Sequence, residues 1–309
     1  MSFTAEVRDE LSRVEPRRDC CARAALSALI RLDGTLTKSA GNTCRLELVT
    51  ESAPVARTII GLAHTVGGLK TELTSRRSVL HKTYSYLITI PSQARLEPCL
   101  RALGLSEHAY LVGGVDEALV KRDCCAMAYL RGAFLGAGFV SDPRADAHFE
   151  IACQSEVLAR DLLSLMRRFD LEAKYVERRG AWTVYLKGAE PILNFLALVG
   201  AHKALLKTEN VRVVKSMRND VNRRVNAEIA NQTKASQAAL AQLDTIERLR
   251  SADLLATLPA GLRQFAELRR ANPDLSLREL GALATPPLSK SAVNHRMRRL
   301  EEAARELQI

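Results

Sequence analysis

The chain has 309 residues, of which 47% are hydrophobic and 26% are charged. This composition is typical of a soluble globular protein and argues against disorder as the default for any long stretch, and the length predicts about two domains. Its formal net charge of +10 fits either a polyanionic partner such as nucleic acid or a basic surface that serves only solubility. Seven cysteines and an N-terminus without an apolar signal-peptide core predict reduced thiols in the cytoplasm. No apolar run reaches the length of a bilayer span, so we expect no membrane contact.

Residues 1–17 form a predicted helical lead-in, and the segment after them occurs twice. RDCCARAALSALIRLDG at 18–34 returns as RDCCAMAYLRGAFLGAG at 122–138. The correspondence continues at an almost constant offset as far as a pair of arginines, Arg76-Arg77 in the first copy and Arg178-Arg179 in the second. Because the two segments stay in register over this length, we interpret them as an internal duplication.

Each copy predicts the same order of elements, αββαββα. A helix rich in small residues comes first, at about 19–32 and 123–136, and strands that alternate polar and apolar residues follow, most clearly at 44–49 and 148–153. The alanines and glycines of the first helix leave little side chain, so its two copies should pack closely across a pseudo-twofold axis. The two sheets would then form adjacent concave surfaces.

The nonamers LSALIRLDG (26–34) and LRGAFLGAG (130–138) resemble the signature of the LAGLIDADG homing endonucleases. The resemblance covers residues 18–204, with copies at about 18–104 and 122–200, and implies that the paired sheets bind DNA. The candidate phosphate contacts on the strands, each of which could equally be an ordinary exposed charge, are Arg45, Arg76, Arg77, Lys82, Arg178, Arg179 and Lys187.

DNA cleavage in that family implies an acidic residue at the penultimate position of each nonamer, because carboxylates there hold divalent ions. The first copy has Asp33, but the second has Ala137, which cannot bind a metal ion. Asp33 is then better explained as a helix-end or turn residue. We therefore predict that the chain is not an enzyme and that it has no catalytic residue and no cofactor.

Two other functions remain as alternatives. A metal-dependent DNA endonuclease would use Asp33, and an RNA-binding, maturase-like protein would stack bases on aromatic side chains. The aromatic residues on the candidate strands are Tyr84, Tyr86, Trp182 and Tyr185.

The vicinal pairs Cys20-Cys21 and Cys124-Cys125 lack the C-x-x-C spacing of metal sites. Neighbouring residues on a helix point about 100° apart, which is unfavourable for binding one ion. We interpret these cysteines as small buried groups in the helix interface and predict no metal site.

Residues 205–235 are a predicted helical connector. Within it, NDVNRRVNAEIAN places Asn219, Asn222 and Asn226 on one helix face, flanked by Arg223 and Arg224. The favoured interpretation of this amide face is polar packing between domains, and contact with sugar-phosphate is the other. A further helix is predicted near 236–250.

Residues 236–309 form a predicted helix-turn-helix domain, and residues 210–309 carry 17 Lys and Arg against 11 Asp and Glu. Helices are predicted at 259–271, at 276–284 behind a capping box, and at 289–307. A short helix, a tight turn and a basic second helix are typical of DNA readers, with a non-DNA three-helix module as the alternative. The candidate DNA contacts on the last helix are Ser289, Lys290, Ser291, Asn294, His295, Arg296, Arg298 and Arg299. The pattern resembles region four of bacterial sigma factors.

The degenerate nonamers, the NRRVN connector and the terminal SKSAVNHRMRRLEE together resemble the WhiA family of sporulation regulators, over essentially the whole chain. The resemblance implies a bacterial, sequence-specific DNA-binding transcription regulator of sporulation or cell division, located on the nucleoid. Its implied partners are double-stranded promoter DNA, RNA polymerase or a sigma factor, and a WhiB-type iron–sulphur co-regulator, and we expect a monomer. The expected fold class is α+β, a tandem pseudo-twofold αββαββα domain followed by an all-α helix-turn-helix domain.

Overall fold

A computed structural model describes residues 2–39, 43–77, 84–107, 110–111, 113–178 and 180–306. Two of the predicted DNA contacts, Lys82 and Arg179, lie outside these ranges. The chain divides into two compact units, residues 1–215 and 216–309. The first is α+β and the second all-α, so the predicted fold class is confirmed.

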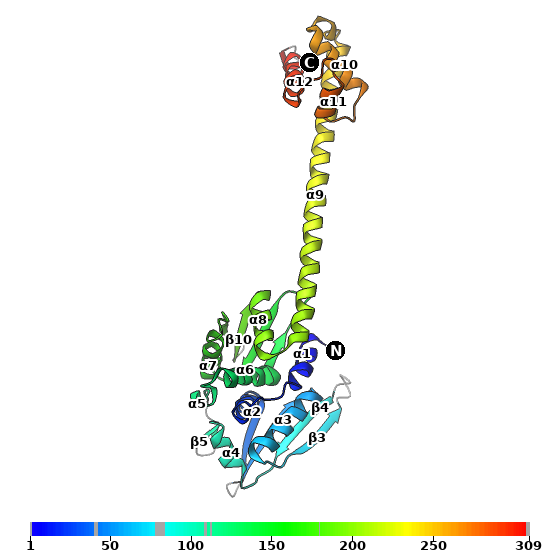
Figure 1. Cartoon of the computed structure of the whole chain (residues 1–309). Coiled ribbons are helices and arrows are strands. Elements are labelled where there is room, and N and C mark those ends of the chain that lie inside the picture. Colours follow the sequence, from blue (N-terminus) through cyan, green and yellow to red (C-terminus); the bar gives the residue numbers. More distant parts are fainter. Residues whose placement is uncertain are drawn as a thin grey trace. The chain divides into compact units, whose positions relative to one another are not determined.

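The first unit contains the αββαββα repeat twice (Figure 1). The first copy consists of α2 (Asp19–Asp33), β1 (Gly34–Ser39), β2 (Thr43–Thr50), α3 (Ala53–Gly67), β3 (Glu72–Arg77), β4 (Tyr84–Ile90) and α4 (Leu96–Ala102). The second consists of α6 (Asp123–Ala137), β7 (Gly138–Val140), β8 (His148–Cys153), α7 (Glu156–Arg167), β9 (Lys174–Arg178), β10 (Ala181–Lys187) and α8 (Ala189–Val199). Strands β5 (Ser106–Glu107) and β6 (Tyr110–Leu111) and helix α5 (Glu117–Val120) connect the copies.

Helices α2 and α6 pack side by side with their backbones in contact, as the small residues predict (Figure 1). A Cβ atom placed on Gly132 of α6 would lie 2.5 Å from the carbonyl oxygen of Ala25 and 3.0 Å from the Cβ of Ala28, both on α2. No side chain fits at that crossing. The helix pair therefore joins the two repeats through backbone contact.

Each repeat builds an antiparallel four-stranded sheet, ordered β1-β2-β4-β3 in the first and β7-β8-β10-β9 in the second. Alternate residues are buried against helices, for example Leu46 and Ile88 in one sheet and Ile151 and Val184 in the other. We call this side of each sheet its helix-covered face. The residues between them form the open face, which is the surface that the homing-endonuclease resemblance assigns to DNA.

The predicted N-terminal lead-in is part of this core. Helix α1 (Phe3–Ser12) buries Val7 and Leu11, and the Thr4 hydroxyl bonds both the carbonyl oxygen of Val140 at 2.7 Å and its amide at 3.0 Å. Glu10 accepts hydrogen bonds from the amides of Lys203 and Ala204, at the start of α9. The lead-in thus stabilises both the edge strand β7 and the first turn of α9.

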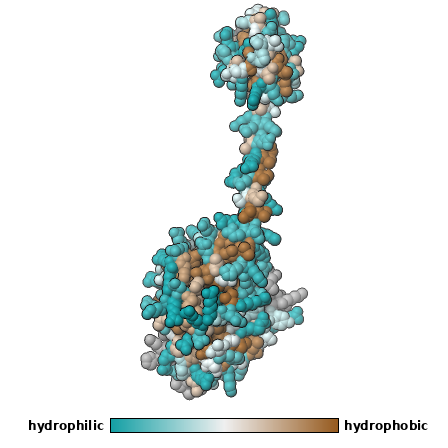
Figure 2. Space-filling model, in the orientation of Figure 1, coloured by the Kyte–Doolittle hydropathy of each residue, from teal (hydrophilic) through white to brown (hydrophobic). Residues whose placement is uncertain are grey.

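Helix α9 (His202–Ser251) is a single helix of 50 residues, not the connector and separate helix that we predict from the sequence. It contains no Gly or Pro, so nothing in its backbone ends it early. Residues 212–238 are all exposed, and Figure 2 shows apolar side chains along this stretch, where Met217, Val221 and Ile229 are more than half exposed.

The second unit packs the end of α9 against a short 3₁₀ turn (Leu255–Thr257), α10 (Ala260–Ala271), α11 (Leu277–Leu283) and α12 (Lys290–Glu306). Its core includes Leu249, Phe265, Val293, Met297 and Leu300. The helices that are described in the two units are all too short or too polar to cross a membrane.

Candidate nucleic-acid interface

The helix-turn-helix begins at a complete capping box on α11. The Ser276 hydroxyl accepts a hydrogen bond from the Glu279 amide at 3.4 Å, and the Glu279 carboxylate accepts one from the Ser276 amide at 2.8 Å. The hydrogen bonds with Ser276 lower the pKa of Glu279. The capping box predicted from the sequence is therefore confirmed.

Close backbone approach sets the angle between α11 and α12. A Cβ atom on Gly281 would lie 2.3 Å from the carbonyl oxygen of Leu288, and the Leu288 amide donates to the carbonyl of Gly281 at 2.8 Å. A glycine is thus required where the turn passes α11.

Arg269 on α10 holds the segment before α11, a role that the sequence analysis missed. Its side chain is buried, and its guanidinium donates to the carbonyl oxygen of Leu275. Burial lowers the pKa of Arg269. The sequence does indicate that Arg269 is buried, because it lies at helical spacing from the apolar residues Leu262, Phe265 and Ala266 on the buried face of α10.

The outward face of α12 carries most of the predicted DNA contacts. Val293, Met297 and Leu300 are buried as predicted. The residues on the other side are exposed and lie toward the first half of the helix: Lys290, Ser291, Asn294, His295, Arg298 and Arg299. Acidic residues follow at Glu301 and Glu302, so the positive charge gathers at the N-terminal part of α12.

Two of the predicted contacts on this helix differ from the rest. Ser289 is the N-cap, since its hydroxyl accepts from the Ala292 amide at 3.2 Å and lies 2.9 Å from the Ser291 hydroxyl. Arg296 is half-buried and donates to the carbonyl oxygen of Gly261 on α10 at 3.2 Å. Arg296 therefore supports the packing of α12 instead of facing outward with its neighbours.

The open face of the first sheet is close to neutral among the residues described. Arg45 lies on it but forms an ion pair with Glu47 at 2.6 Å. Arg76 pairs in register with Ser85 and shares this face with Glu72. Arg77 is opposite Tyr84, so it points to the other side of the sheet, where it lies over the Tyr84 ring at 5.9 Å. Adjacent strand residues alternate sides, so Arg76 lies on the open face and Arg77 does not, and contact of either arginine with phosphate stays a prediction.

The open face of the second sheet is more basic. Its register places Lys174, Arg178 and Lys187 there, against Glu150, which pairs with His148 at 3.0 Å. Lys174 was missed by the sequence analysis, although its alternation with Val176 and Arg178 could have indicated it.

Most of the aromatic side chains proposed for base stacking lie on the wrong side of their sheets for contact with a nucleic acid on the open faces. Of the four aromatic residues proposed for stacking, Tyr84, Tyr86 and Trp182 lie on the helix-covered sides. Tyr185 lies on the open face of the second sheet, opposite Glu150 and Lys174.

The two positions that would supply nuclease carboxylates lie at the ends of α2 and α6. Burial raises the pKa of Asp33 to about 7, and the Arg8 guanidinium opposes this rise only in part. Arg8 also donates to the carbonyl oxygen of Gly138, next to Ala137, at 2.9 Å. Within the described ranges, no group of three or more acidic, His or Cys side chains at this place brings its ligand atoms together as one metal ion requires. A guanidinium from α1 thus lies where a nuclease would need metal-binding acids.

The amide face of α9 is exposed throughout. Asn219, Asn222 and Asn226, with Arg223 and Arg224 beside them, belong to the stretch in which every residue is exposed. The packing role that we favour from the sequence is therefore not seen for these side chains within either unit.

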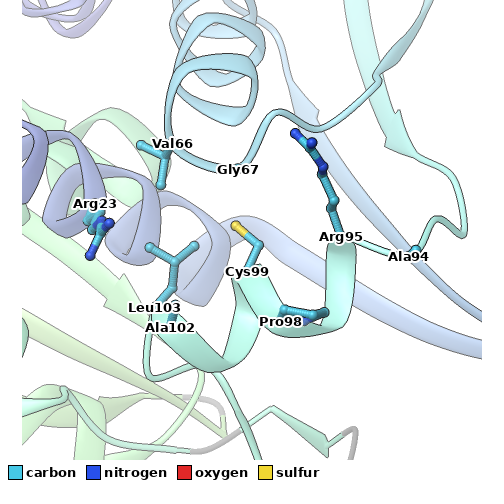
Figure 3. Close-up of a pocket in the computed structure, with 9 residues that line it drawn as sticks. All are labelled: Arg23, Val66, Gly67, Ala94, Arg95, Pro98, Cys99, Ala102 and Leu103. Atoms are coloured by element: carbon cyan, nitrogen blue, oxygen red, sulfur yellow. The ribbon is translucent and has the colours of Figure 1, made fainter.

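A pocket between α2, α3 and α4 does not resemble an active site. Figure 3 shows Cys99 pointing toward Gly67 across it, with Arg23 and Arg95 from opposite sides. Its other lining residues are apolar. Burial raises the pKa of Cys99, which makes it a poor nucleophile.

Comparison with known proteins extends these observations over the whole chain. Residues 19–106 match the WhiA N-terminal LAGLIDADG-like domain, residues 126–218 the WhiA LAGLIDADG-like domain, and residues 221–304 the WhiA C-terminal HTH domain. The chain belongs to the WhiA family. A relative named "Probable cell division protein WhiA" from Heliobacterium modesticaldum is 46% identical over 98% of this chain and 96% of its own length. Another from Desulforamulus reducens is 45% identical over 99% and 96%.

Solved WhiA structures share the fold. The full-length DUF199/WhiA from Thermatoga maritima matches with a TM-score of 0.62 and 23% identity over 99% of both chains. The N-terminal LAGLIDADG domain of DUF199/WhiA matches with a TM-score of 0.52 and 21% identity, over 64% of this chain and 90% of that one. The WhiA fold therefore includes both the duplicated unit and the helix-turn-helix unit.

Proposed function

We propose that this WhiA-family chain is a sequence-specific, DNA-binding transcription regulator without nuclease activity. The observation that carries the proposal is the exposed N-terminal half of α12. It combines amide, hydroxyl, imidazole and guanidinium groups on α12, and the turn that leads from the capped helix α11 into α12 is fixed by the contact between Gly281 and Leu288. Such a helix fits the major groove, where base edges differ in their donors and acceptors.

The side chains of α12 divide into two roles. Asn294 can make two hydrogen bonds with adenine and Arg298 two with guanine, and His295 and Ser291 lie on the same exposed side. Lys290 and Arg299 are placed at its flanks and suit phosphate contacts, which set register but carry no sequence information.

The open faces of the two sheets supply a weaker, sequence-tolerant contact in this proposal. Lys174, Arg178 and Lys187 form its basic part, and Arg76 adds one charge from the first sheet. The Arg45–Glu47 pair weakens the contribution of Arg45. Contacts of this kind lengthen a footprint and make binding depend on salt concentration.

The same geometry supports the proposed loss of cleavage. Ala137 offers no ligand atom, and Asp33 is partly buried beside Arg8, which repels a divalent cation. The exposed amide face at Asn219, Asn222 and Asn226 is available for sugar-phosphate contact. Among the described residues of the open faces, Tyr185 is the one of the four proposed stacking residues that lies there, which does not favour RNA.

The biological process is proposed from the relatives, which are named as cell division proteins. We propose that this chain also acts in cell division, and in the cell division that accompanies sporulation. Promoter DNA would be the main partner, on the nucleoid, and RNA polymerase or a sigma factor and a WhiB-type co-regulator would act at the same promoters.

The test separates base reading from phosphate contact. Genome-wide chromatin immunoprecipitation would first define the binding site, and fluorescence anisotropy would then compare that duplex with a scrambled one across salt concentrations. Asn294→Ala with Arg298→Ala removes two bidentate contacts of about 1–3 kcal/mol each and should reduce the preference for the site by roughly 30-fold or more. Arg305→Ala removes an arginine from the last turn of the same helix and should leave the preference unchanged.

A second pair of variants tests the sheets. Arg178→Gln with Lys187→Gln should lower the slope of log affinity against log salt by about 1–2 without changing the preferred site. If the site preference survives in the α12 variant, or if the protein cleaves the duplex in the presence of Mg²⁺, the proposal is wrong.

A further inference from the structure

The two vicinal cysteine pairs, which the sequence analysis treats separately, meet in the structure. Cys20 and Cys21 are in the first turn of α2, and Cys124 and Cys125 are in the first turn of α6. The close packing of these helices across the pseudo-twofold axis brings all four Sγ atoms within 4.8 Å of one another. Within one pair, the Sγ atoms of Cys124 and Cys125 are 4.0 Å apart, so adjacent helical cysteines do converge here.

This spacing fits one metal ion and not a multinuclear cluster. Zinc–sulphur bonds of about 2.3 Å in a tetrahedron place the sulphur atoms about 3.8 Å apart. The observed spread, up to 4.8 Å, requires the sulphur atoms to move closer together by about 1 Å at most when the ion binds. An iron–sulphur cluster has several metal atoms and bridging sulphides inside its cysteine cage, which would hold the thiolates farther apart than this.

The surroundings stabilise negative charge. Four thiolates around a divalent ion carry a net charge of about −2, and the amino ends of both helices point toward them. Arg122 lies with its guanidinium 4.0 Å from the Cys20 sulphur. Arg17 and Arg131, against one acidic residue, Glu15, line a groove that also contains Cys21 and Cys124 and opens to solvent. Cys20 and Cys124 are half-buried, so an ion can enter, whereas Cys21 and Cys125 are buried.

We propose that Cys20, Cys21, Cys124 and Cys125 bind a single thiophilic divalent ion of the zinc class, in a closed tetrahedral site that joins the two repeats. Binding displaces the four thiol protons and transfers no electrons. The ion sits at the amino ends of α2 and α6, and Asp33 and Ala137 are at the carboxyl ends, so the site is separate from the former nuclease position. With no open coordination position, the metal has a structural role.

The first experiment measures binding by the full-length, reduced protein. Metal-free protein is titrated with Co²⁺, whose tetrahedral thiolate complexes absorb strongly in the visible and near-ultraviolet, and then with Zn²⁺ in competition. One equivalent of Co²⁺ should give a tetrathiolate spectrum that Zn²⁺ abolishes. Thermal unfolding with and without one equivalent of Zn²⁺ should show a higher melting temperature for the loaded protein.

Matched cysteine variants assign the ligands. Cys20→Ser and Cys124→Ser change half-buried residues and are expected to fold, yet each should weaken Zn²⁺ affinity by more than about 100-fold, since even mutations outside the ligand shell can cost 10- to 100-fold. Cys99→Ser alters a cysteine in the pocket of Figure 3 and should bind like the wild type.

Three results would overturn the proposal. They are a wild-type protein that gives no thiolate spectrum, Cys20→Ser and Cys124→Ser variants that bind like Cys99→Ser, and mass spectrometry that finds the four cysteines paired as disulfides after purification under reducing conditions. None of these readouts depends on DNA binding, so the metal site and the proposed function can fail separately.

Discussion

Replacement of Gly132 by alanine should destabilise the first unit, although alanine favours helices. The added methyl group would lie 2.5 Å from the Ala25 carbonyl oxygen, and that atom belongs to the backbone of α2 and cannot rotate away. Overpacking of a tight interface costs about 3 kcal/mol at the upper end of its usual range. The higher helix propensity of alanine offsets about 1 kcal/mol. We therefore expect a net loss of about 2 kcal/mol in the free energy of unfolding.

Gly61 provides the matched control. It lies inside α3, and a Cβ atom there would meet nothing within 4 Å. Gly61→Ala should consequently stabilise the unit by about 1 kcal/mol, through helix propensity alone. The two substitutions are chemically identical, but they should change the stability in opposite directions.

Denaturant unfolding monitored by tryptophan fluorescence measures both variants. The chain has a single tryptophan, Trp182, on β10, so its emission reports on the first unit. Thermal unfolding gives a second measure, because in a unit of this size a change of about 1 kcal/mol in stability shifts the melting temperature by about 2–4 °C. Gly132→Ala should therefore melt roughly 4–8 °C lower than the wild type and Gly61→Ala roughly 2–4 °C higher. If Gly132→Ala stays within about 0.5 kcal/mol of the wild type, the two backbones do not meet at this residue.

Three further predictions concern single side chains. Burial raises the pKa of Asp33 to about 7, so the wild type should lose stability as the pH rises from about 4 to about 7, by as much as about 4 kcal/mol. Asp33→Asn should remove this dependence on pH. Urea unfolding at about pH 5 and about pH 8 compares the two proteins, and an equal change in their free energies of unfolding would show that the buried carboxyl has no such effect. Ser276→Ala removes a cap worth about 1 kcal/mol and should speed amide hydrogen exchange in α11, whereas Ser276→Thr should not. Arg296→Ala loses the bond to Gly261 and should lower the melting temperature of the second unit without abolishing site preference, the reverse of Arg298→Ala; equal melting temperatures would show that the bond contributes nothing.

The local structure of both units follows closely from sequence patterns. Small residues predict the contact at Gly132, alternation predicts strands such as β8, and the Ser276–Glu279 spacing predicts the cap of α11. These features depend on interactions between residues that are near one another in the chain or that repeat with a fixed period. The same alternation rule places Arg76 and Arg77 on opposite sides of β3.

Contacts between residues that are far apart in the chain are harder to predict from the sequence. Arg8 binds the carbonyl of Gly138, 130 positions away, and no local pattern indicates that contact. The cysteine cluster could have been anticipated, because equivalent residues of two helices that pack about a twofold axis must meet near that axis. Neither Cys20-Cys21 nor Cys124-Cys125 has the spacing of a metal site by itself, so the cluster depends on the packing of α2 against α6. The unbroken α9 reflects the absence of Gly and Pro, a negative signal that is easily overlooked.

Because both repeats belong to one polypeptide, the open faces of the two sheets can differ in charge, and this affects how a polyanion would lie on them. In a homodimer every substitution appears on both subunits, so the two halves of its surface stay equivalent. Here each half has changed independently, and Lys174, Arg178 and Lys187 lie on one sheet while Arg45 is neutralised by Glu47 on the other. A polyanion lying across both sheets therefore experiences an uneven potential, which gives the bound molecule a preferred direction.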